Sequence, residues 1–562
     1  MSTLISKASL LLVPSVYEDG TLYNVLPSGN KAPDETGNHN GYDQTRADFT
    51  FSRGSNLAAT RVNADGLIEK GRENLLLQSN SFSTSPWVSN NLTLTSGQVD
   101  KDGGANAWLL DITAGTNSQR LEQDIVLSSI ATFSIYVKAG TLNWVRLRTD
   151  GATTRNNYFD LENGVIGTTS GIDAKIEDVG NNWFRCSVVT DDVTRVRIYP
   201  ADADGDVTHT SGSIYIQSAQ LEKGLVSTPY IETGATTATA GVLENTPRID
   251  YSSGAGALLL EPQRTNGVAN SEYIGGWNSI QSGITLTANY GISPEGVRNS
   301  TRIQFSGASL ELRDTTSVAA GNMSSIYIKG TNGETIKFGS NGAEELFTLN
   351  GEWQRIEKYN ATAATKITIN TYSGATARDI EVYGAMQEAG SHVSSYVPTY
   401  GSAATRGADI VDGKEDSSLY NDSEGVLFVE FSALSATRDN EFRFMISDGT
   451  NDDRIQIGLQ TGGDLYASVI ESNSATASFN YTLPNPTQTH KVAIKYKAND
   501  CALWVDGIER GTDISATMPS GLDIFDFYRT PNNNNYVEAN VKQVIYFDEA
   551  LSDSELATLT TL

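Results

Sequence analysis

An internal duplication constrains the fold of this chain more than any other feature of its sequence. Residues 134–140 read Ser-Ile-Tyr-Val-Lys-Ala-Gly, and residues 325–330 repeat them as Ser-Ile-Tyr-Ile-Lys-Gly. The same landmarks surround both copies in the same order: an upstream tryptophan (Trp87, Trp277), a Trp-x-Arg run (183–185, 353–355), a strand-like run (214–224, 380–390) and a closing proline (Pro229, Pro398). Matching residues of the two copies lie about 190 positions apart at the upstream tryptophan and about 170 at the closing proline. Such a change in separation is typical of insertions and deletions in surface loops. The chain therefore contains a duplicated domain.

Both copies have the pattern of β-strands. Residues 133–138 and 326–329 alternate between β-branched or aromatic residues and polar ones, which predicts strands with one buried face. Short runs of this kind follow one another between Gly and Asn turn signals, as in sandwiches and jelly rolls. Helical periodicity is nearly absent from both copies. We therefore predict an all-β, multidomain chain with tandem jelly-roll or β-sandwich domains.

Length and charge exclude several classes of protein. A chain of 562 residues is too long for one hydrophobic core and predicts about three to five domains. Its 67 acidic against 40 basic residues give a net charge of −27, which disfavours nucleic acid and anionic membranes as partners.

We find neither a signal-peptide pattern nor an apolar run long enough to span a bilayer, so we expect a soluble chain without membrane insertion. Cys186 and Cys501 fall in different predicted domains, so packing rather than disulfides must stabilise the fold.

Composition divides the chain into six segments. We predict an N-terminal docking region (1–75), a first duplicated sandwich (76–233), a linker with short strands (234–265), a second duplicated sandwich (266–405), a connector (406–423) and a C-terminal sandwich with a short helix (424–562). The linker begins with small polar residues that are typical of flexible connections. The N-terminal region has too few apolar residues for a core of its own. We expect it to dock on the next domain or on a neighbouring subunit.

Several runs resemble a module that is common in tailed-bacteriophage fibre and spike proteins. They are residues 49–68, 74–80, 246–251 and 258–266. In that family such runs lead into jelly rolls similar to carbohydrate-binding modules, which end in a Gln-Leu-Glu-x-Gly-like strand. Residues 220–224 match this ending, and residues 386–390 match it more loosely. The resemblance covers roughly residues 8–406 and implies a virion protein made in the host cytoplasm. The motifs are architectural, so the resemblance implies no catalytic residues.

The C-terminal segment has its own pattern. Trp504 begins a Trp-Val-Asp-Gly hairpin signal, and Ser552 with Glu555 forms a capping box for a short helix whose Leu556 and Leu559 face inward. Strands, this hairpin and the final helix resemble concanavalin-like (laminin-G-like) lectin sandwiches over about 140 residues. The resemblance implies the fold but says little about a ligand, because function lies in loops on such folds.

Catalytic motifs are not recognisable in the sequence. The four histidines (His39, His209, His392, His490) are scattered, and the strand-like run 426–431 carries Glu430 alone where a glycosidase needs two carboxylates. We therefore predict that the chain is not an enzyme and needs no cofactor.

One acidic loop could hold a cation. Asp202, Asp204 and Asp206 alternate as calcium ligands can. However, the glycine is fourth rather than sixth, and Ser213 stands where a bidentate glutamate is needed. A solvated acidic loop is the favoured interpretation, and calcium remains the alternative.

Two places could bind a sugar. The loop 528–536 places Tyr528, Arg529, Asn534 and Tyr536 around four consecutive asparagines, and so offers aromatic faces with planar polar groups. The alternative for this loop is a solvated hairpin tip. The second place is formed by Trp87 and Trp277, for which core packing is the favoured interpretation and a stacking platform the alternative.

These observations predict a non-enzymatic structural and adhesive protein of a phage virion, a fibre or spike subunit that binds a host-surface glycan. A head-attached decoration fibre and a glycan depolymerase are the alternatives. The expected partners are other virion proteins, host-surface polysaccharide and further copies of the chain. We expect a homotrimer because the sparse N-terminal region can pack against its own copies. A monomer docked on another virion protein is the alternative.

Overall fold

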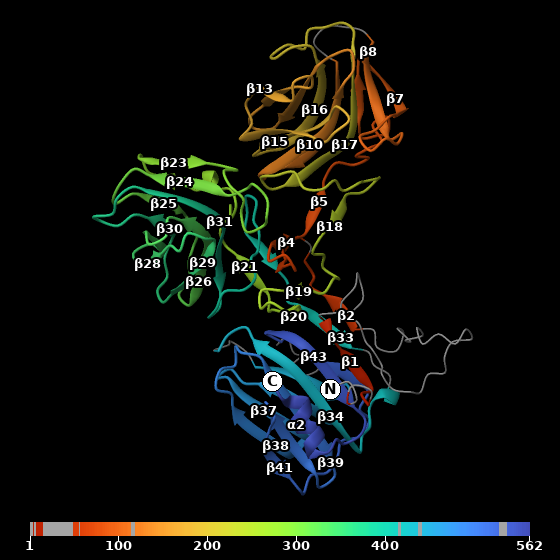
Figure 1. The fold of residues 1–562 in the computed structure, drawn as a ribbon, viewed down its shortest axis with the longest axis vertical. Coiled ribbons are helices and arrows are strands. Elements are labelled where there is room, and N and C mark those ends of the chain that lie inside the picture. The colour runs from red at the N-terminus through yellow and green to blue at the C-terminus, as the bar shows by residue number, and fades with distance from the viewer. Residues whose placement is uncertain are drawn as a thin grey trace, which may run out of the picture.

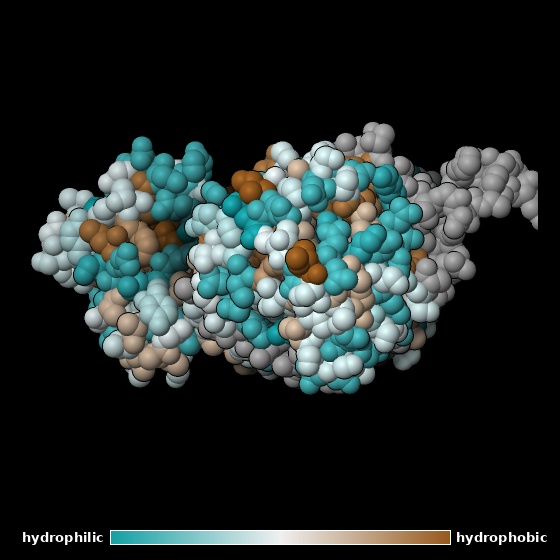
Figure 2. Space-filling model, turned by 90° about the horizontal axis from the view of Figure 1, so that it is seen from below, coloured by the Kyte–Doolittle hydropathy of each residue, from teal (hydrophilic) through white to brown (hydrophobic). Residues whose placement is uncertain are grey.

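The computed structural model describes residues 4, 7–14, 49–55, 57–113, 119–413, 417–436, 441–527 and 537–562. Three β-sandwiches account for most of these residues, and the strands between them meet at a central junction (Figure 1). Each sandwich encloses a core whose side chains come from both of its sheets. The predicted all-β, multidomain fold is confirmed. On the face seen in Figure 2, hydrophobic residues form small separate patches among hydrophilic ones.

The first sandwich has two six-stranded sheets, in the orders β14-β15-β10-β17-β8-β7 and β13-β12-β11-β16-β9-β6. The strands are β6 (Val88–Asn90), β7 (Leu92–Gln98), β8 (Ala107–Ile112), β9 (Arg120–Leu127), β10 (Ala131–Ala139), β11 (Trp144–Asp150), β12 (Arg155–Asp160), β13 (Val165–Thr169), β14 (Asp173–Asp178), β15 (Trp183–Thr190), β16 (Val193–Ala201) and β17 (Ser213–Lys223).

The second sandwich has two five-stranded sheets, in the orders β22-β25-β30-β27-β28 and β23-β24-β31-β26-β29. The strands are β22 (Ser279–Ile280), β23 (Ile284–Thr287), β24 (Thr301–Phe305), β25 (Glu311–Asp314), β26 (Asn322–Gly330), β27 (Thr335–Ser340), β28 (Glu345–Thr348), β29 (Gln354–Asn360), β30 (Ile367–Asn370) and β31 (Arg378–Ala389).

The duplication is visible in the pairing of these strands. β10 lies between β15 and β17, and β26 lies between β29 and β31, each with a register shift at the repeated Ser-Ile-Tyr. Arg185 donates to Ser134 Oγ at 3.0 Å, and Arg355 donates to Ser325 Oγ at 2.9 Å. The two copies are therefore equivalent down to single hydrogen bonds.

The closing landmark of each copy is a tyrosine rather than a proline. Tyr230 Oη lies 2.6 Å from Ser79 Oγ, and Tyr396 Oη lies 2.6 Å from Ser271 Oγ. A threonine three residues after each tyrosine exchanges hydrogen bonds with the same serine. Matching Pro229 with Pro398 was therefore wrong by three residues, because hydrogen bonding and not the proline ends the domain.

The third sandwich is assembled from separate parts of the chain. One sheet has the order β19-β20-β43-β34-β39-β40-β41 with β1 also paired to β43, and the other has the order β2-β33-β42-β35-β36-β37-β38. The strands are β1 (Leu10–Leu12), β2 (Phe49–Ser52), β19 (Ile249–Asp250), β20 (Ala257–Leu260), β33 (Ile410–Gly413), β34 (Glu424–Ala433), β35 (Phe442–Ser447), β36 (Arg454–Leu459), β37 (Asp464–Glu471), β38 (Ser474–Thr482), β39 (His490–Lys497), β40 (Cys501–Val505), β41 (Ile508–Asp513), β42 (Ile524–Asp526) and β43 (Ala539–Phe547).

This assembly corrects the predicted domain map. The regions 1–75, 234–265 and 406–423 were expected to dock, link or connect, but each supplies strands to the third sandwich. The described N-terminal strands pair with β43 and β33 of the same chain, so they need no neighbouring copy. The prediction failed because antiparallel pairing over several hundred residues leaves no local pattern in the sequence.

The duplicated sandwiches are insertions into the third. Two-stranded stalks frame them: β5 (Arg72–Asn74) pairs β18 (Ala238–Ala240), and β21 (Arg264–Asn266) pairs β32 (Ala404–Arg406). A buried asparagine ends the first strand of each stalk. Asn74 Nδ2 donates to the carbonyls of Ala219 and Ile231, and Asn266 Nδ2 donates to two carbonyls in the same way. A hairpin of β3 (Thr60–Val62) and β4 (Ile68–Lys70) lies at the junction, near β19 in Figure 1.

The C-terminal helix matches its prediction. α2 (Asp553–Thr560) begins at the capping box of Ser552 and Glu555. Its Leu556 and Leu559 are buried against one face of the β43 sheet. Cys186 and Cys501 are both buried free thiols. None of the described helices has the length and hydrophobicity that a membrane-spanning helix needs.

Candidate functional site

The residues predicted to bind a sugar are not brought together. The loop 528–536, with Tyr528, Arg529, Asn534 and Tyr536, lies outside the described residues. Trp87 is 6% exposed in the core of the first sandwich and Trp277 is 4% exposed in that of the second. Neither ring can stack on a sugar, so the stacking alternative for both tryptophans is wrong and core packing is what the structure has.

The acidic loop at 202–206 does not converge on one point. Asp204 accepts hydrogen bonds from the backbone and hydroxyl of Thr168, and Asp206 accepts both bonds from Thr208. Asp202 lies 3.6 Å from His209 Nδ1. Among the described residues, no group of three or more His, Cys, Asp or Glu side chains could hold a metal ion. The solvated-loop interpretation therefore fits the geometry better than calcium does.

The sheets that contain β10 and β26 correspond to each other in the two copies. The outer face of each of these sheets is covered by other parts of the chain. In the first sandwich, Lys101 lies over Tyr136 at 5.4 Å and its backbone binds Gln217, so the loop around it covers the face that carries Trp183. In the second sandwich, Ile68 of the β3–β4 hairpin packs on the corresponding face with Tyr383 and Tyr396. These faces are therefore closed to a large ligand.

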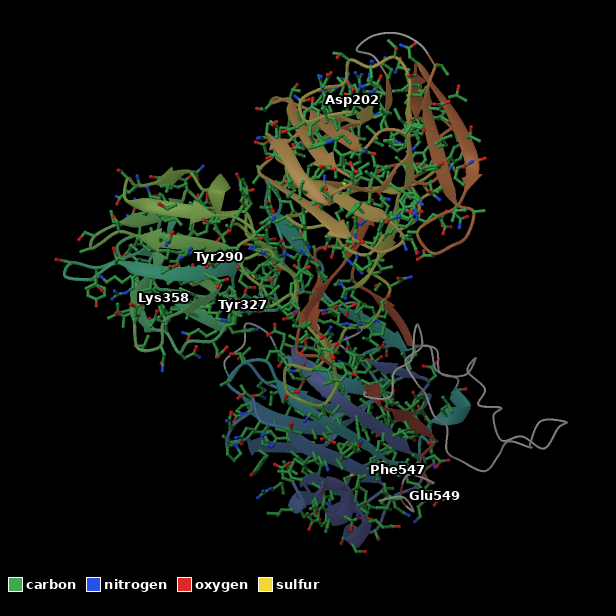
Figure 3. All side chains as sticks on the ribbon, turned by 45° about the horizontal axis from the view of Figure 1, so that its top comes forward. Asp202, Tyr290, Tyr327, Lys358, Phe547 and Glu549 are labelled. Carbon is green, nitrogen blue, oxygen red and sulfur yellow. The ribbon has the colours of Figure 1, made fainter. Side chains whose placement is uncertain are left out.

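An open groove lies between the first and second sandwiches. Its volume is about 610 Å³, which is within the usual range of ligand sites. One wall is β14 with the neighbouring residues of β15, and the other is the loop 287–298 of the second sandwich. Val226 and Val297 give it apolar lining, and Tyr290 stands in the rim, 37% exposed. Figure 3 shows that Tyr290 belongs to the second sandwich and Asp202 to the first.

The charges in the groove are balanced. Asp173, Lys175 and Glu177 lie at alternate positions of β14, and Arg298 faces them from the other sandwich. Lys175 and Glu177 pair with each other. The groove is thus locally neutral in a chain whose net charge is −27. Such a lining suits polar ligands with many hydroxyl groups.

One asparagine ties the two walls together. Asn289 Nδ2 donates to Asp173 Oδ2 at 2.7 Å and to the carbonyl of Leu225 at 2.8 Å, both in the first sandwich. Trp353 Nε1 donates to the carbonyl of Ile292 at 2.9 Å, so the loop is also held from within its own sandwich. These contacts give the groove fixed walls.

A buried lysine anchors the tip of the same loop. Lys70 Nζ lies 2.9 Å from Glu272 Oε1 and 3.0 Å from Glu295 Oε2, and none of the three side chains is more than 8% exposed. Burial would lower the pKa of Lys70, but the two carboxylates raise it well above its usual 10.5. Burial likewise raises the pKa of Glu272, against the opposing effect of Lys70. Tyr383 Oη bonds both carboxylates.

A second buried ionic cluster lies where the third sandwich meets the β21–β32 stalk of the second. Asp409 pairs with Arg53 and Arg248, and Glu261 pairs with Arg248 at 2.7 Å and Arg406 at 2.9 Å. All five side chains are almost fully buried. Burial lowers the pKa of Arg53 to about 10 despite Asp409. Arg53, Arg248 and Glu261 lie in the runs 49–68, 246–251 and 258–266, so these runs supply buried ion pairs at the junction.

Sequence reasoning missed the groove. Asn289 and Arg298 belong to no motif, and the partners of the Asn289 side chain, Asp173 and Leu225, lie 116 and 64 residues earlier in the chain. The only local signal is that Asn289, with a φ of 50°, precedes a glycine-containing turn. That signal marks a loop but not a site.

Comparisons with known proteins add little to this geometry. A search against models of protein families found no match, and a search of curated proteins found none. Among solved structures, the chain is similar to the Ruminococcus gnavus IT-sialidase CBM40 bound to alpha2,3 sialyllactose, at 13% identity, 26% of this chain, 86% of that chain and a TM-score of 0.23. It is also similar to the tandem CBM22 domain of Paenibacillus barcinonensis Xyn10C, at 9% identity, 60% and 100% coverage and a TM-score of 0.20. Scores this low carry no argument, and the sandwich fold rests on the sheets of this chain.

Proposed function

We propose that this chain is a structural and adhesive subunit of a tailed-phage virion and that it binds a host-surface glycan in the groove between the duplicated sandwiches. The groove carries the proposal. It has the volume of a ligand site, an exposed aromatic ring at Tyr290, and polar side chains from both walls. Sugars bind where aromatic faces and planar polar groups occur together.

The buried clusters support an adhesive role. Lys70 ties the β3–β4 hairpin to the second sandwich, and the Arg248 cluster ties the third sandwich to the stalk of the second. Loss of one partner of a buried ion pair strongly destabilises a protein, so these pairs favour one arrangement of the segments that they join. A fibre subunit needs such rigidity to present a site at a distance from the particle.

Replacing Tyr290 tests the groove. Tyr290→Ala should weaken binding of the full chain on an array of bacterial surface polysaccharides by about tenfold or more, because aromatic anchors contribute on the order of 2 kcal/mol. Tyr359→Ala is the matched control, since Tyr359 is 50% exposed on β29 of the same sandwich and does not line the groove. Equal binding by wild type and both variants would remove the groove from the proposal.

The loop 528–536 remains a predicted site and is tested on the same array. A double variant, Asn534→Ala with Tyr536→Ala, should bind as the wild type does if the groove is the site. Loss of binding by this variant, with Tyr290→Ala unaffected, would move the site to the C-terminal sandwich.

The proposed role is non-enzymatic. The groove carboxylates are Asp173, which accepts a hydrogen bond from Asn289, and Glu177, which pairs with Lys175. Incubation with host polysaccharide should release no new reducing ends. Clear release would replace this proposal with the depolymerase alternative.

Position on the virion and oligomeric state complete the proposal. Labelled antibody on intact particles distinguishes a tail fibre from a head-attached decoration fibre. Light scattering should give three times the chain mass of 60.4 kDa for a trimer. A mass of one chain would instead favour a monomer docked on another virion protein.

A further inference from the structure

The side-chain amide of Asn289 lies in the wall of the groove. Its Nδ2 donates to the carboxylate of Asp173 and to the carbonyl of Leu225. Both partners are acceptors, so rotating the amide by 180° would set oxygen against oxygen, and its orientation is fixed. Asn289 is 8% exposed, and its Oδ1 has no hydrogen-bond partner among the described residues. A buried acceptor without a partner is unfavourable, so a donor from a ligand would stabilise this oxygen.

Arg298 supplies the opposite kind of group beside it. Its Nε donates to the carbonyls of Asn289 and Tyr290, both at 3.0 Å, which holds the guanidinium against the loop. Its Nη1 and Nη2 make no hydrogen bond or ion pair within the described part of the chain, and the side chain is exposed in the groove. A planar guanidinium with two free nitrogen atoms on one edge matches a carboxylate better than any other single group.

The other charged side chains of the groove leave the guanidinium of Arg298 available to a ligand. Lys175 and Glu177 neutralise each other, and Asp173 is tied to Asn289 on the first sandwich. The remaining cation is Arg298 on the second sandwich. Salt screens exposed charges that lie more than about 8 Å away at physiological ionic strength. A ligand carboxylate should therefore turn toward the second sandwich, with its hydroxyl groups toward Asp173.

The aromatic ring at the rim completes the set. Tyr290 carries the Arg302 guanidinium over its ring at 4.6 Å, which fixes the ring, and it remains 37% exposed. Its exposed surface can cover the C–H face of a sugar ring. The loop 287–298 thus offers a hydrogen-bond acceptor at Asn289, a guanidinium at Arg298 and an apolar ring face at Tyr290.

We propose that the groove selects acidic sugars, with the carboxylate on Arg298, a hydroxyl or amide N–H donating to Asn289 Oδ1, and the ring against Tyr290. This selectivity rests on the proposed glycan-binding function. A carboxylate-bearing saccharide, such as a hexuronate polymer, is the ligand class, and a neutral polymer of the same backbone should bind much more weakly.

The experiment compares acidic polysaccharides with their carboxyl-reduced forms, in which each carboxylate has become a hydroxyl group on the same backbone. The full chain is tested on an array that carries hexuronate-containing and neutral polysaccharides. Arg298→Gln should weaken binding to the acidic polymers roughly 10- to 100-fold, because hydrogen bonds to charged groups contribute about 1.5–3 kcal/mol. Arg298→Lys keeps the positive charge but not the planar pair of N–H donors. It should therefore bind the acidic polymers better than Arg298→Gln does but more weakly than the wild type does.

Arg313→Gln is the control, because Arg313 is a partly exposed arginine of the same sandwich that pairs with Glu311 outside the groove. Carboxyl reduction should abolish the effect of Arg298→Gln. Equal binding of acidic and reduced polymers, with Tyr290→Ala still harmful, would overturn the acidic selectivity and leave the glycan function standing. Binding of no saccharide at all would overturn the glycan function and the selectivity with it.

Discussion

Replacing Lys70 by methionine tests whether the buried triad holds the junction. The variant keeps the length and apolar stem of the side chain but removes its charge. Glu272 and Glu295 then face each other without a cation, with side chains 0% and 8% exposed. Three N–O contacts of 2.9, 3.2 and 3.0 Å are lost at once.

The expected loss of stability is large. Removing one partner of a buried ion pair destabilises a protein by about 3–5 kcal/mol, because the other charge stays buried. For a sandwich the size of the second one, this corresponds to a fall in melting temperature of roughly 10 °C. Lys497→Met is the control, since Lys497 makes an exposed ion pair with Glu424 and its loss should leave the melting temperature unchanged.

The pH dependence gives a second check. Burial holds the pKa of Glu272 above its usual 4.5, and removing Lys70 takes away a charge that lowers it, so its pKa should rise further. A carboxyl group with a raised folded-state pKa favours folding most below its unfolded pKa and loses that contribution as the pH rises. The deficit of Lys70→Met should therefore be smaller at pH 4 than at pH 8. In the wild type, the contribution of Lys70 should be lost only above pH 10.5.

Differential scanning calorimetry at both pH values measures these effects. Adding Glu295→Gln to Lys70→Met should restore part of the stability, because it removes one of the two unpaired charges. A melting temperature within two or three degrees of wild type, taken on the scale of roughly 2–4 °C per kcal/mol, would refute the reasoning. So would a deficit that does not depend on pH.

Three further predictions follow from the fold. Trp87→Ala should lower stability by about 3–5 kcal/mol, as large-to-small changes in cores do, while glycan binding by folded molecules stays the same; calorimetry with the array decides this. A fragment of residues 424–562 should fail to give a folded monomer, because five strands of its sandwich come from earlier parts of the chain. A fragment of residues 72–240 should fold alone, and circular dichroism with light scattering distinguishes the two outcomes. The hydrogen bonds of Lys7 and Ser552 lower the pKa of Glu555 to about 2, so its contribution to stability is present above pH 4.5 and lost as the pH falls toward 2. The protection of α2 against hydrogen exchange, taken relative to the intrinsic rate at each pH, should therefore decrease in that range for the wild type but not for Glu555→Gln.

Local patterns in the sequence were enough for the elements and for the duplication. Alternation along residues 133–138 specifies a strand because neighbouring side chains point to opposite faces, whatever lies beyond. The capping box of Ser552 and Glu555 satisfies backbone groups within one turn, so it too is readable locally. Repetition of these patterns in one order is enough to predict two equivalent domains from the sequence.

The sequence also favoured packing for Trp87 and Trp277, since large aromatic side chains are usually buried in cores. It could not exclude the stacking alternative, because exposure depends on what covers a ring. Only the tertiary structure, in which each ring lies within a core and donates its N–H to a backbone carbonyl, decided the matter.

Contacts between distant segments were decided by tertiary structure alone. The third sandwich gathers strands from five parts of the chain, and Arg53 meets Asp409 across 356 residues. The groove lies between two sandwiches, and Asn289 of one binds Asp173 of the other across it. A pairing partner leaves no mark on its own neighbourhood in the sequence, since hydrogen bonding and charge pairing require proximity in space and not along the chain. Periodicity therefore determined the strands of this protein, and long-range pairing determined its domains and its candidate site.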